Sequence, residues 1–284
     1  MFRILLLLIT LPLPSYAIII RHDVPDEQYR ATINDFPALA TLYVDGAHGT
    51  LIAPEWVVTA AHASFCIKPK STILINGRIR QIGQLYVHPD YQPGESHDIA
   101  LMQLSAPALD VTPAKLYQKE DEEGLVAWFI GIGGTGNGEL GETIDNALNN
   151  GLLRQAQNRI HAAQGPLLIF EFDKGEQALP LEGVSGGGDS GGPAFIRTQN
   201  GFELLGVSSR FTGGSIGQYG ISEYYSRISF FYSWIDSIIT GDDGQRASLA
   251  QNRLAHLPAG LTPDILPSVC NAIAINDSHR NLIK

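Results

Sequence analysis

A single serine, Ser190, stands in a glycine-rich stretch at residues 186–193. Five glycines and one proline surround it. Such residues contribute little side-chain packing, but they allow a tight turn with positive φ or a close approach of the backbone to neighbouring atoms. Such a loop can expose a hydroxyl and turn neighbouring N–H groups toward one point, as acyl transfer by a serine nucleophile requires. Glycine-rich segments with Ser and Asp are also often plain solvent loops, so this stretch alone leaves both interpretations open.

Two further segments favour the catalytic interpretation. His62 follows the apolar run 56–58, so it lies at the end of a predicted strand, where an imidazole can act as a base. Asp98 begins the apolar run 98–101, where a carboxylate can be buried beside an imidazole. Each has an ordinary explanation when taken alone, because histidines are often structural and aspartates are often turn residues.

Together and in this order, T-A-A-H at 59–62, D-I-A-L at 98–101 and G-D-S-G-G-P ending at Pro193 resemble the chymotrypsin/trypsin-like serine protease family. The resemblance extends over residues 18–240, with supporting matches at 49–52, 87–91, 225–228 and 234–235. It implies an all-β fold of two antiparallel six-stranded-type β-barrels, with the active site between them and a C-terminal helix. It also implies a serine endopeptidase that hydrolyses peptide bonds through an acyl-enzyme intermediate.

The resemblance assigns the catalytic roles residue by residue. Ser190 attacks the carbonyl carbon, His62 takes its proton and later returns it, and Asp98 fixes the tautomer of the imidazole. The N–H groups of Gly188 and Ser190 form the oxyanion hole. The resemblance to the family's triad implies these roles, and the spacing of the residues alone does not assign them.

The resemblance also points to substrate-binding residues. Ser208 or Ser209, with Ser209 preferred, falls where the family supports the aspartate and pairs its next residues with the substrate backbone. Val184 stands six residues before the nucleophile and favours apolar substrates, because members with a basic preference carry Asp there. Glu223 replaces a glycine that usually keeps the specificity pocket open, and its carboxylate could meet a substrate Lys or Arg. The alternatives are a Glu223 that faces solvent and a mixed or apolar preference.

Residues 1–17 have the pattern of a removable secretory leader. A positive charge near the start precedes an apolar run at 4–11, and the small residues Ser15 and Ala17 suit a cleavage site. We therefore expect a secreted or periplasmic protein without stable membrane association once the leader is removed. The alternative is a retained anchor that continues through 18–20, which two prolines and the short apolar length oppose.

The expected N-terminus bears on activation. Family members become active when a new Ile or Val amine pairs with the aspartate before the nucleophile, which here is Asp189. Cleavage after Ala17 would expose Ile18 as such an N-terminus, so we expect no separate zymogen cleavage. One departure weakens this hypothesis, because Ile-Ile-Ile-Arg at 18–21 lacks the flexible glycines of the family's Ile-Val-Gly-Gly start.

The sequence holds two cysteines, Cys66 and Cys270. A secreted protein with two cysteines has one possible intramolecular disulfide, which here would tie the C-terminal tail beside His62. Two free or intermolecularly bonded thiols are the alternative. The family bridge that starts at the residue after the catalytic histidine is absent, because Ala63 stands there.

Charge and motifs argue against several other classes. A net charge of −10 opposes nucleic-acid binding. The two thiols and eight histidines form no C-x-x-C or H-E-x-x-H pattern, so we expect no metal. Residues 131–136 satisfy G-x-G-x-x-G, but loop residues at 137–141 replace the required helix and no acidic residue stands at 153–160. We therefore expect no cofactor, and a strand and turn of the second barrel at this place.

The pattern along the chain predicts the domain organisation. With 284 residues, 44% hydrophobic and 17% charged, the chain can fill one or two cores. Short alternating strands separated by turns predict barrel one at about 18–118 and barrel two at about 119–228. An apolar helical stripe predicts a closing helix at 229–240, with Ser229 as N-cap and Gly241 just past the end. The extension at 241–284 has weak periodicity and no assigned role.

A second class of function shares the expected fold. Some trypsin-like chains are inactive binding proteins, and these usually lack a residue of the triad. None is lost here, which favours an enzyme that acts on a protein or peptide substrate. We expect a monomer.

Overall fold

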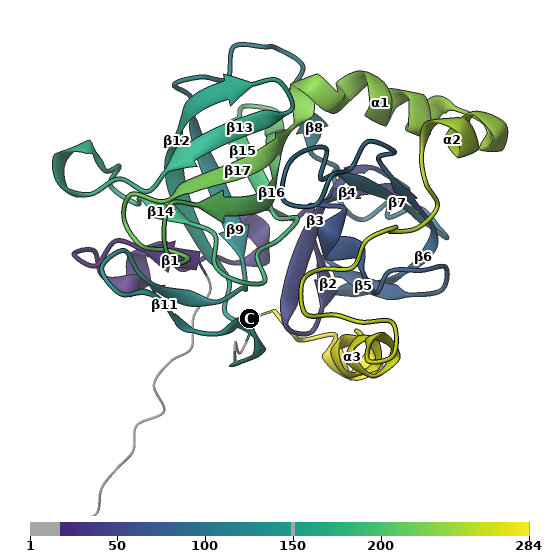
Figure 1. The fold of residues 1–284 in the computed structure, drawn as a ribbon, viewed down its shortest axis with the longest axis horizontal. Coiled ribbons are helices and arrows are strands. Elements are labelled where there is room, and N and C mark those ends of the chain that lie inside the picture. Colours follow the sequence, from purple (N-terminus) through teal and green to yellow (C-terminus); the bar gives the residue numbers. More distant parts are fainter. Residues whose placement is uncertain (1–17, 149–150, 284) are drawn as a thin grey trace, which may run out of the picture.

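The computed structural model describes residues 18–148 and 151–283, and the expected leader at 1–17 lies outside the described residues. Two β-barrels lie side by side in Figure 1, and helix α1 starts between them and runs over the first barrel. This is the predicted all-β architecture of two antiparallel six-stranded barrels with a C-terminal helix. None of the helices in the described part of the chain is long and apolar enough to cross a membrane.

The first barrel is a closed sheet in the order β2-β3-β4-β7-β6-β5. Its strands are β2 (Leu39–Tyr43), β3 (Gly46–Ala53), β4 (Trp56–Thr59), β5 (Thr72–Ile75), β6 (Arg78–Val87) and β7 (Ala100–Leu104). The predicted hairpin turn between β5 and β6 is present, with φ of 48° at Asn76 and 68° at Gly77. Positive φ at both turn residues matches the twist of the flanking strands.

The second barrel closes in the order β15-β9-β12-β13-β17-β16, and β8 adds in parallel to β16. Its strands are β8 (Lys115–Leu116), β9 (Val126–Gly131), β12 (Arg154–Gln164), β13 (Leu167–Glu171), β15 (Pro193–Thr198), β16 (Gly201–Thr212) and β17 (Ser222–Arg227). A small sheet beside it contains β11 (Gly141–Ile144), β10 (Thr135–Asn137), β1 (Ile18–Ile20) and β14 (Gly183–Val184). Short 3₁₀ turns occupy Asp26–Tyr29, Ile33–Asp35, His62–Ser64, Asn146–Leu148, Gly175–Gln177 and Asp277–His279.

Helix α1 (Ile228–Thr240) starts one residue earlier than predicted, and Ser229 is not its N-cap. Arg227 precedes the helix and pairs through its guanidinium with the buried carboxylate of Glu122, at 2.7 Å. The Ser229 hydroxyl lies within the first turn and donates to the same carboxylate at 2.5 Å. A buried anion therefore draws the hydroxyl away from the helix backbone. Gly241 lies just past the helix end, as predicted.

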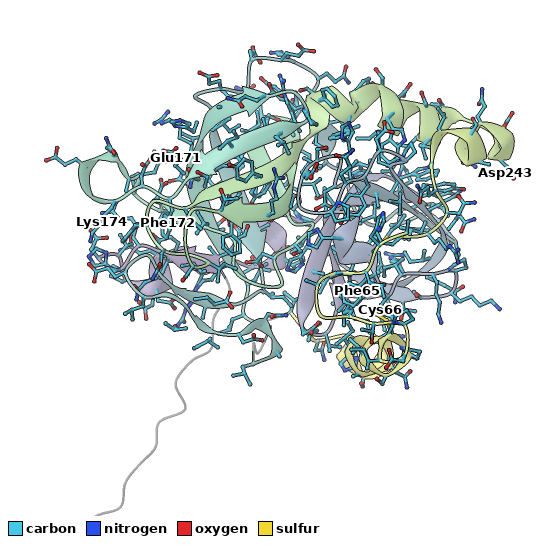
Figure 2. All side chains as sticks on the ribbon, viewed as in Figure 1. Phe65, Cys66, Glu171, Phe172, Lys174 and Asp243 are labelled. Atoms are coloured by element: carbon cyan, nitrogen blue, oxygen red, sulfur yellow. A yellow bond between two sulfur atoms is a disulfide. The ribbon has the colours of Figure 1, made fainter. Side chains whose placement is uncertain are left out.

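The C-terminal tail wraps around the first barrel (Figure 1). It carries α2 (Asp243–Leu249) and α3 (Leu266–Ile273), and backbone bridges join it to the barrel at Val87–Gln251 and Tyr43–Ala274. In Figure 2, Phe65 and Cys66 lie next to α3, while Asp243 lies at the far end of the tail's path. The segment that the sequence left unexplained is thus an integral part of the fold.

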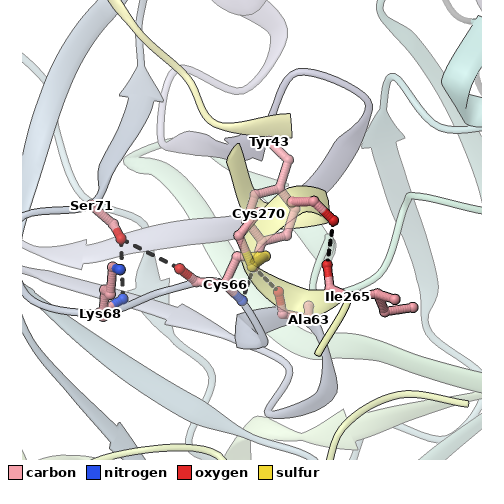
Figure 3. The surroundings of a disulfide bond; sticks show 8 residues. Tyr43, Ala63, Cys66, Lys68, Ser71, Ile265 and Cys270 are labelled. Atoms are coloured by element: carbon pink, nitrogen blue, oxygen red, sulfur yellow. Dashed lines mark hydrogen bonds between the residues drawn. A yellow bond between two sulfur atoms is a disulfide. The ribbon is translucent and has the colours of Figure 1, made fainter. Parts of the chain in front are cut away.

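The predicted disulfide between Cys66 and Cys270 is present, with a Cα–Cα distance of 5.3 Å (Figure 3). On the barrel side, the Tyr43 hydroxyl donates to the carbonyl of Ala63 at 2.7 Å and accepts from the Cys66 N–H at 3.1 Å. The bond therefore fastens α3 to the segment that directly follows His62.

Candidate active site

Adjacent strands bring His62 and Asp98 together. Thr59 at the end of β4 is paired with Ala100 at the start of β7, so the residues just beyond these ends become neighbours. The Nδ1 atom of His62 lies 2.6 Å from Oδ2 of Asp98, and the His62 backbone N–H donates to Oδ1 at 2.9 Å. A carboxylate at Nδ1 favours the tautomer with the proton on that nitrogen, which leaves Nε2 able to accept one.

In this pair, the charge of each partner stabilises the charged form of the other. Burial opposes the imidazolium, but the charge and hydrogen bond of Asp98 outweigh it and raise the pKa of His62 above its ordinary value. Burial also opposes the carboxylate, yet the nearby His62 and the donors around it lower the pKa of Asp98. Asp98 thus remains an anion that stabilises a proton on His62.

The second barrel holds Asp98 from the other side. The Ser209 hydroxyl on β16 donates to Oδ2 of Asp98 at 2.7 Å, so Ser209 and not Ser208 has this position. The Ser226 hydroxyl on β17 donates to the Asp98 carbonyl at 2.8 Å. Sequence reasoning missed Ser226, since a serine inside a strand carries no signal of such a contact.

Ser190 lies where the two barrels meet. Its carbonyl accepts from the His48 N–H on β3 at 2.8 Å, and the N–H of the next residue, Gly191, donates to the Ser208 carbonyl on β16 at 2.9 Å. Gly191 has a φ of 77°, and a Cβ there would collide with the His48 carbonyl and the Thr59 side chain. Only glycine permits this approach, which fixes the half-buried Ser190 against strands of both barrels.

The two amides expected at an oxyanion hole have no acceptor among the described residues. Gly188 has a φ of 81°, and its carbonyl accepts from Ala47 N–H at 2.6 Å. Within residues 18–148 and 151–283, the N–H groups of Gly188 and Ser190 donate to no protein atom. Donors in this state can take an oxygen of a bound molecule.

Asp189 is buried beneath this loop. Its Oδ1 accepts from the Gly133 N–H at 2.8 Å and its Oδ2 accepts from the Gly186 N–H at 2.9 Å. The His48 Nε2 atom lies 3.6 Å from Oδ1. Ile18, the expected partner of Asp189, lies in β1 with 1% exposure, and its carbonyl accepts from the Thr135 hydroxyl at 3.1 Å.

The G-x-G-x-x-G stretch at 131–136 has a structural explanation in the same contacts. Strand β9 runs directly into a turn and then into β10, with no helix between them. A Cβ at Gly131 or Gly133 would collide with the Asp189 carboxylate. The glycines therefore allow the backbone to approach Asp189, and the strand and turn predicted at this place are present.

A cavity of about 310 Å³ opens beside Ser190. Its lining comes from the glycine-rich loop and strands β16 and β17: Ser185, Gly186, Gly187, Ser190, Ser208, Ser209, Arg210, Phe211, Ile216 and Glu223. Within residues 18–148 and 151–283, no group of three His, Cys, Asp or Glu side chains is placed to hold a metal ion.

Glu223 lies in this cavity and Val184 does not. Glu223 is 4% exposed, and its Oε2 accepts from the Ser185 N–H at 3.1 Å. Burial raises the pKa of Glu223 to about 8, with repulsion from Asp189 adding to it and the Ser185 bond opposing it. Val184 instead packs in an apolar cluster with Ile19, Phe172 and Ile221.

The fold has two barrels. A paired histidine and aspartate, and a serine in a glycine-rich loop, lie at their junction. These features define the class of the chymotrypsin-like serine endopeptidases. The family model described as Trypsin matches residues 26–235, and the chain belongs to this family.

Curated relatives agree with this assignment. The chain is 29% identical over 229 residues to "Serine protease SSP1" of Scolopendra subspinipes, with 69% of this chain and 76% of that protein covered. It is 28% identical over 226 residues to "Trypsin" of Saccharopolyspora erythraea, with 71% and 92% covered. A 27% match to "Limulus clotting factor C" of Carcinoscorpius rotundicauda covers 67% of this chain and 22% of that larger protein. The chain is therefore a serine endopeptidase.

Proposed function

We propose that this endopeptidase works through Ser190, His62 and Asp98 and passes through an acyl-enzyme intermediate. The observation that carries the proposal is the hydrogen-bonded chain from Ser209 through Asp98 to His62, at the barrel junction that also holds Ser190. Such a chain orients the imidazole and supplies the base that a serine hydroxyl needs, because the hydroxyl alone is too weak an acid to ionise at neutral pH.

In the proposed reaction, Ser190 Oγ attacks the substrate carbonyl carbon while His62 Nε2 takes the hydroxyl proton. The carbonyl oxygen becomes an anion, which the N–H groups of Gly188 and Ser190 stabilise. His62 then gives its proton to the leaving amine, and the acyl-enzyme forms. Water, activated by the same imidazole, releases the acyl group.

A fluorophosphonate probe tests the proposed nucleophile. The wild type should be labelled and should hydrolyse peptide esters, whereas Ser190→Ala should lose both properties. Asp98→Asn should fold normally but lose about four orders of magnitude in kcat, because the imidazole takes the wrong tautomer. Hydrolysis that survives in Ser190→Ala would overturn the mechanism, and an unlabelled, inactive wild type would favour a binding protein on the same fold.

We also propose where the protein is located, how its N-terminus forms and how the chain is divided. The leader pattern at 1–17 and the disulfide support a secreted or periplasmic protein, since disulfides persist in oxidising compartments. Removal of the leader would create the Ile18 amine, which we place opposite Asp189 in the active enzyme. We further propose a monomer in which residues 18–240 form the protease domain and 241–284 form a stabilising extension.

For the residue before the scissile bond we propose a Lys or Arg preference, supported by the Glu223 carboxyl in the cavity wall. A buried carboxylate and a buried cation are each costly alone, and pairing them offsets that cost. A preference for apolar residues is the competing outcome.

A further inference from the structure

Where strand β16 borders the cavity, its two successive residues Arg210 and Phe211 point their side chains to opposite faces of the sheet. In the pairing with β17, Arg210 is opposite Tyr224 and Phe211 is opposite Glu223. Because side chains alternate along a strand and opposite residues share a face, Arg210 lies with Tyr224, on the other face from Phe211 and Glu223. The Arg210 guanidinium lies 4.4 Å from the centre of the Tyr224 ring, which confirms this placement.

Within the described residues, Arg210 makes no ion pair. The carboxylates that act on it through space are Asp98 and Glu95, and Asp98 is already bound by His62 and Ser209. Burial lowers the pKa of Arg210 from its ordinary value, but a guanidinium remains charged at any working pH. The side chain is thus a half-buried, unpaired cation on a chain of net charge −10.

An extended peptide that pairs with the edge of β16 would place its side chains alternately on these two faces. The side chain of the residue whose carbonyl is attacked would enter the cavity, on the face of Phe211 and Glu223. Counting that residue as the first, the second and fourth residues before the cut would face Arg210. A guanidinium held over a tyrosine ring is preorganised to bind a carboxylate through two hydrogen bonds.

We propose that Arg210 selects an acidic side chain at the second or fourth residue before the scissile bond. The inference rests on the proposed function and adds to it a substrate class: peptides with Asp or Glu upstream of the cleaved bond. Both residues border the cavity, but their side chains leave the sheet on opposite faces, so Glu223 and Arg210 act on different side chains of one substrate.

Fluorogenic peptides that differ in one residue test the proposal. With the best first residue held constant, Glu, Gln and Lys are compared in turn at the second and fourth positions. For the wild type, we expect kcat/KM for Glu over Gln to be about tenfold or more at one of them, roughly the discrimination of one charge-assisted contact. High salt should reduce this ratio.

Arg210 variants decide whether this side chain is responsible. Arg210→Leu should bring the Glu-to-Gln ratio close to one, Arg210→Lys should leave an intermediate ratio, and Arg210→Glu should favour Lys. Arg253→Glu is the matched control, because it makes the same charge change at an exposed tail position and should leave the ratio as in the wild type.

The outcomes separate this inference from the proposed function. A wild type that cleaves the peptides without preferring Glu, or an Arg210→Leu variant that keeps the preference, overturns the role of Arg210 and leaves the catalytic proposal intact. A wild type that cleaves none of the peptides overturns both.

Discussion

The Ser209 hydroxyl donates to the same Asp98 oxygen that lies 2.6 Å from Nδ1 of His62. The donor belongs to the second barrel, whereas the carboxylate and the imidazole belong to the first. The geometry of the pair therefore depends on how the two barrels are docked, as well as on the strands that carry it.

Ser209→Ala should lower kcat/KM by about tenfold, because a hydrogen bond to a charged group contributes roughly 1.5–3 kcal/mol and only part of it acts on the transition state. Ser209→Thr keeps a hydroxyl and should retain most of the activity. The measurement is hydrolysis of one peptide ester by the three proteins. Equal loss in the Ala and Thr variants would indicate a packing effect rather than a lost donor.

The Cys66–Cys270 bond should be a large contributor to stability. It closes a loop with a sequence separation of 204, for which chain entropy gives about 5 kcal/mol. The double variant Cys66→Ser/Cys270→Ser should therefore lower Tm by roughly 10–20 °C. Calorimetry of both proteins measures the shift, with reduced wild type as the control. An unchanged Tm would show that the tail is held by its backbone bridges alone.

The Ile18 amine that forms when the leader is removed should be required for activity. One alanine inserted before Ile18 should remove most of the activity, because the amine could no longer reach Asp189. The control carries a longer extension that a second protease removes up to Ile18, and its removal should restore hydrolysis. Unchanged activity with the extra alanine would contradict insertion of the amine.

The sequence was sufficient where chemistry depends on residue type and order. The motifs around His62, Asp98 and Ser190 predicted the family, and the alternating strands predicted both barrels. It was insufficient where a tertiary contact decides. Ser229 has the residue type of an N-cap, but the buried Glu122 binds its hydroxyl instead.

The tail shows the same limit. Helices α2 and α3 span only 7 and 8 residues, too short to form a clear periodic pattern. Helix α2 is held to α1 by the hydrogen bond from Arg246 to the Ile238 carbonyl, and α3 is held by the disulfide. A single sequence does not reveal such contacts.

His88 should make the protein sensitive to acid. It is 8% exposed, packs against the rings of His97, Phe231 and Trp234, and accepts from the Asp90 N–H at 3.2 Å. Burial lowers the pKa of His88 to about 4. Repulsion from His97 adds to this effect, and attraction to Asp90 opposes it. The unfolded chain therefore binds this proton first as the pH falls.

The contribution of neutral His88 to the free energy of unfolding is complete above the ordinary pKa of 6.5, and it is lost as the pH falls toward 4. We expect a loss of roughly 2–3 kcal/mol from this group across that window. Urea unfolding at pH 7 and pH 4.5 should show a smaller loss for His88→Asn than for the wild type. Equal losses in both proteins would mean that His88 does not titrate in this way.

Glu223 should make cleavage after Lys and Arg depend on pH in a way that other cleavage does not. Its pKa of about 8 lies above the ordinary value, so the carboxyl is mostly protonated at neutral pH and becomes an anion as the pH rises through 8. Since only the anion pairs strongly with a substrate cation, kcat/KM for Lys and Arg peptides should rise across this range, with most of the change in KM. Peptides with a neutral first residue should show only the titration of His62.

Glu223→Gln should abolish the rise, and Glu223→Gly should selectively lose cleavage after Lys and Arg, both measured as pH profiles on paired peptides. A wild type that prefers Phe, Leu or Ala, or a rise that persists in Glu223→Gln, would rule the assignment out.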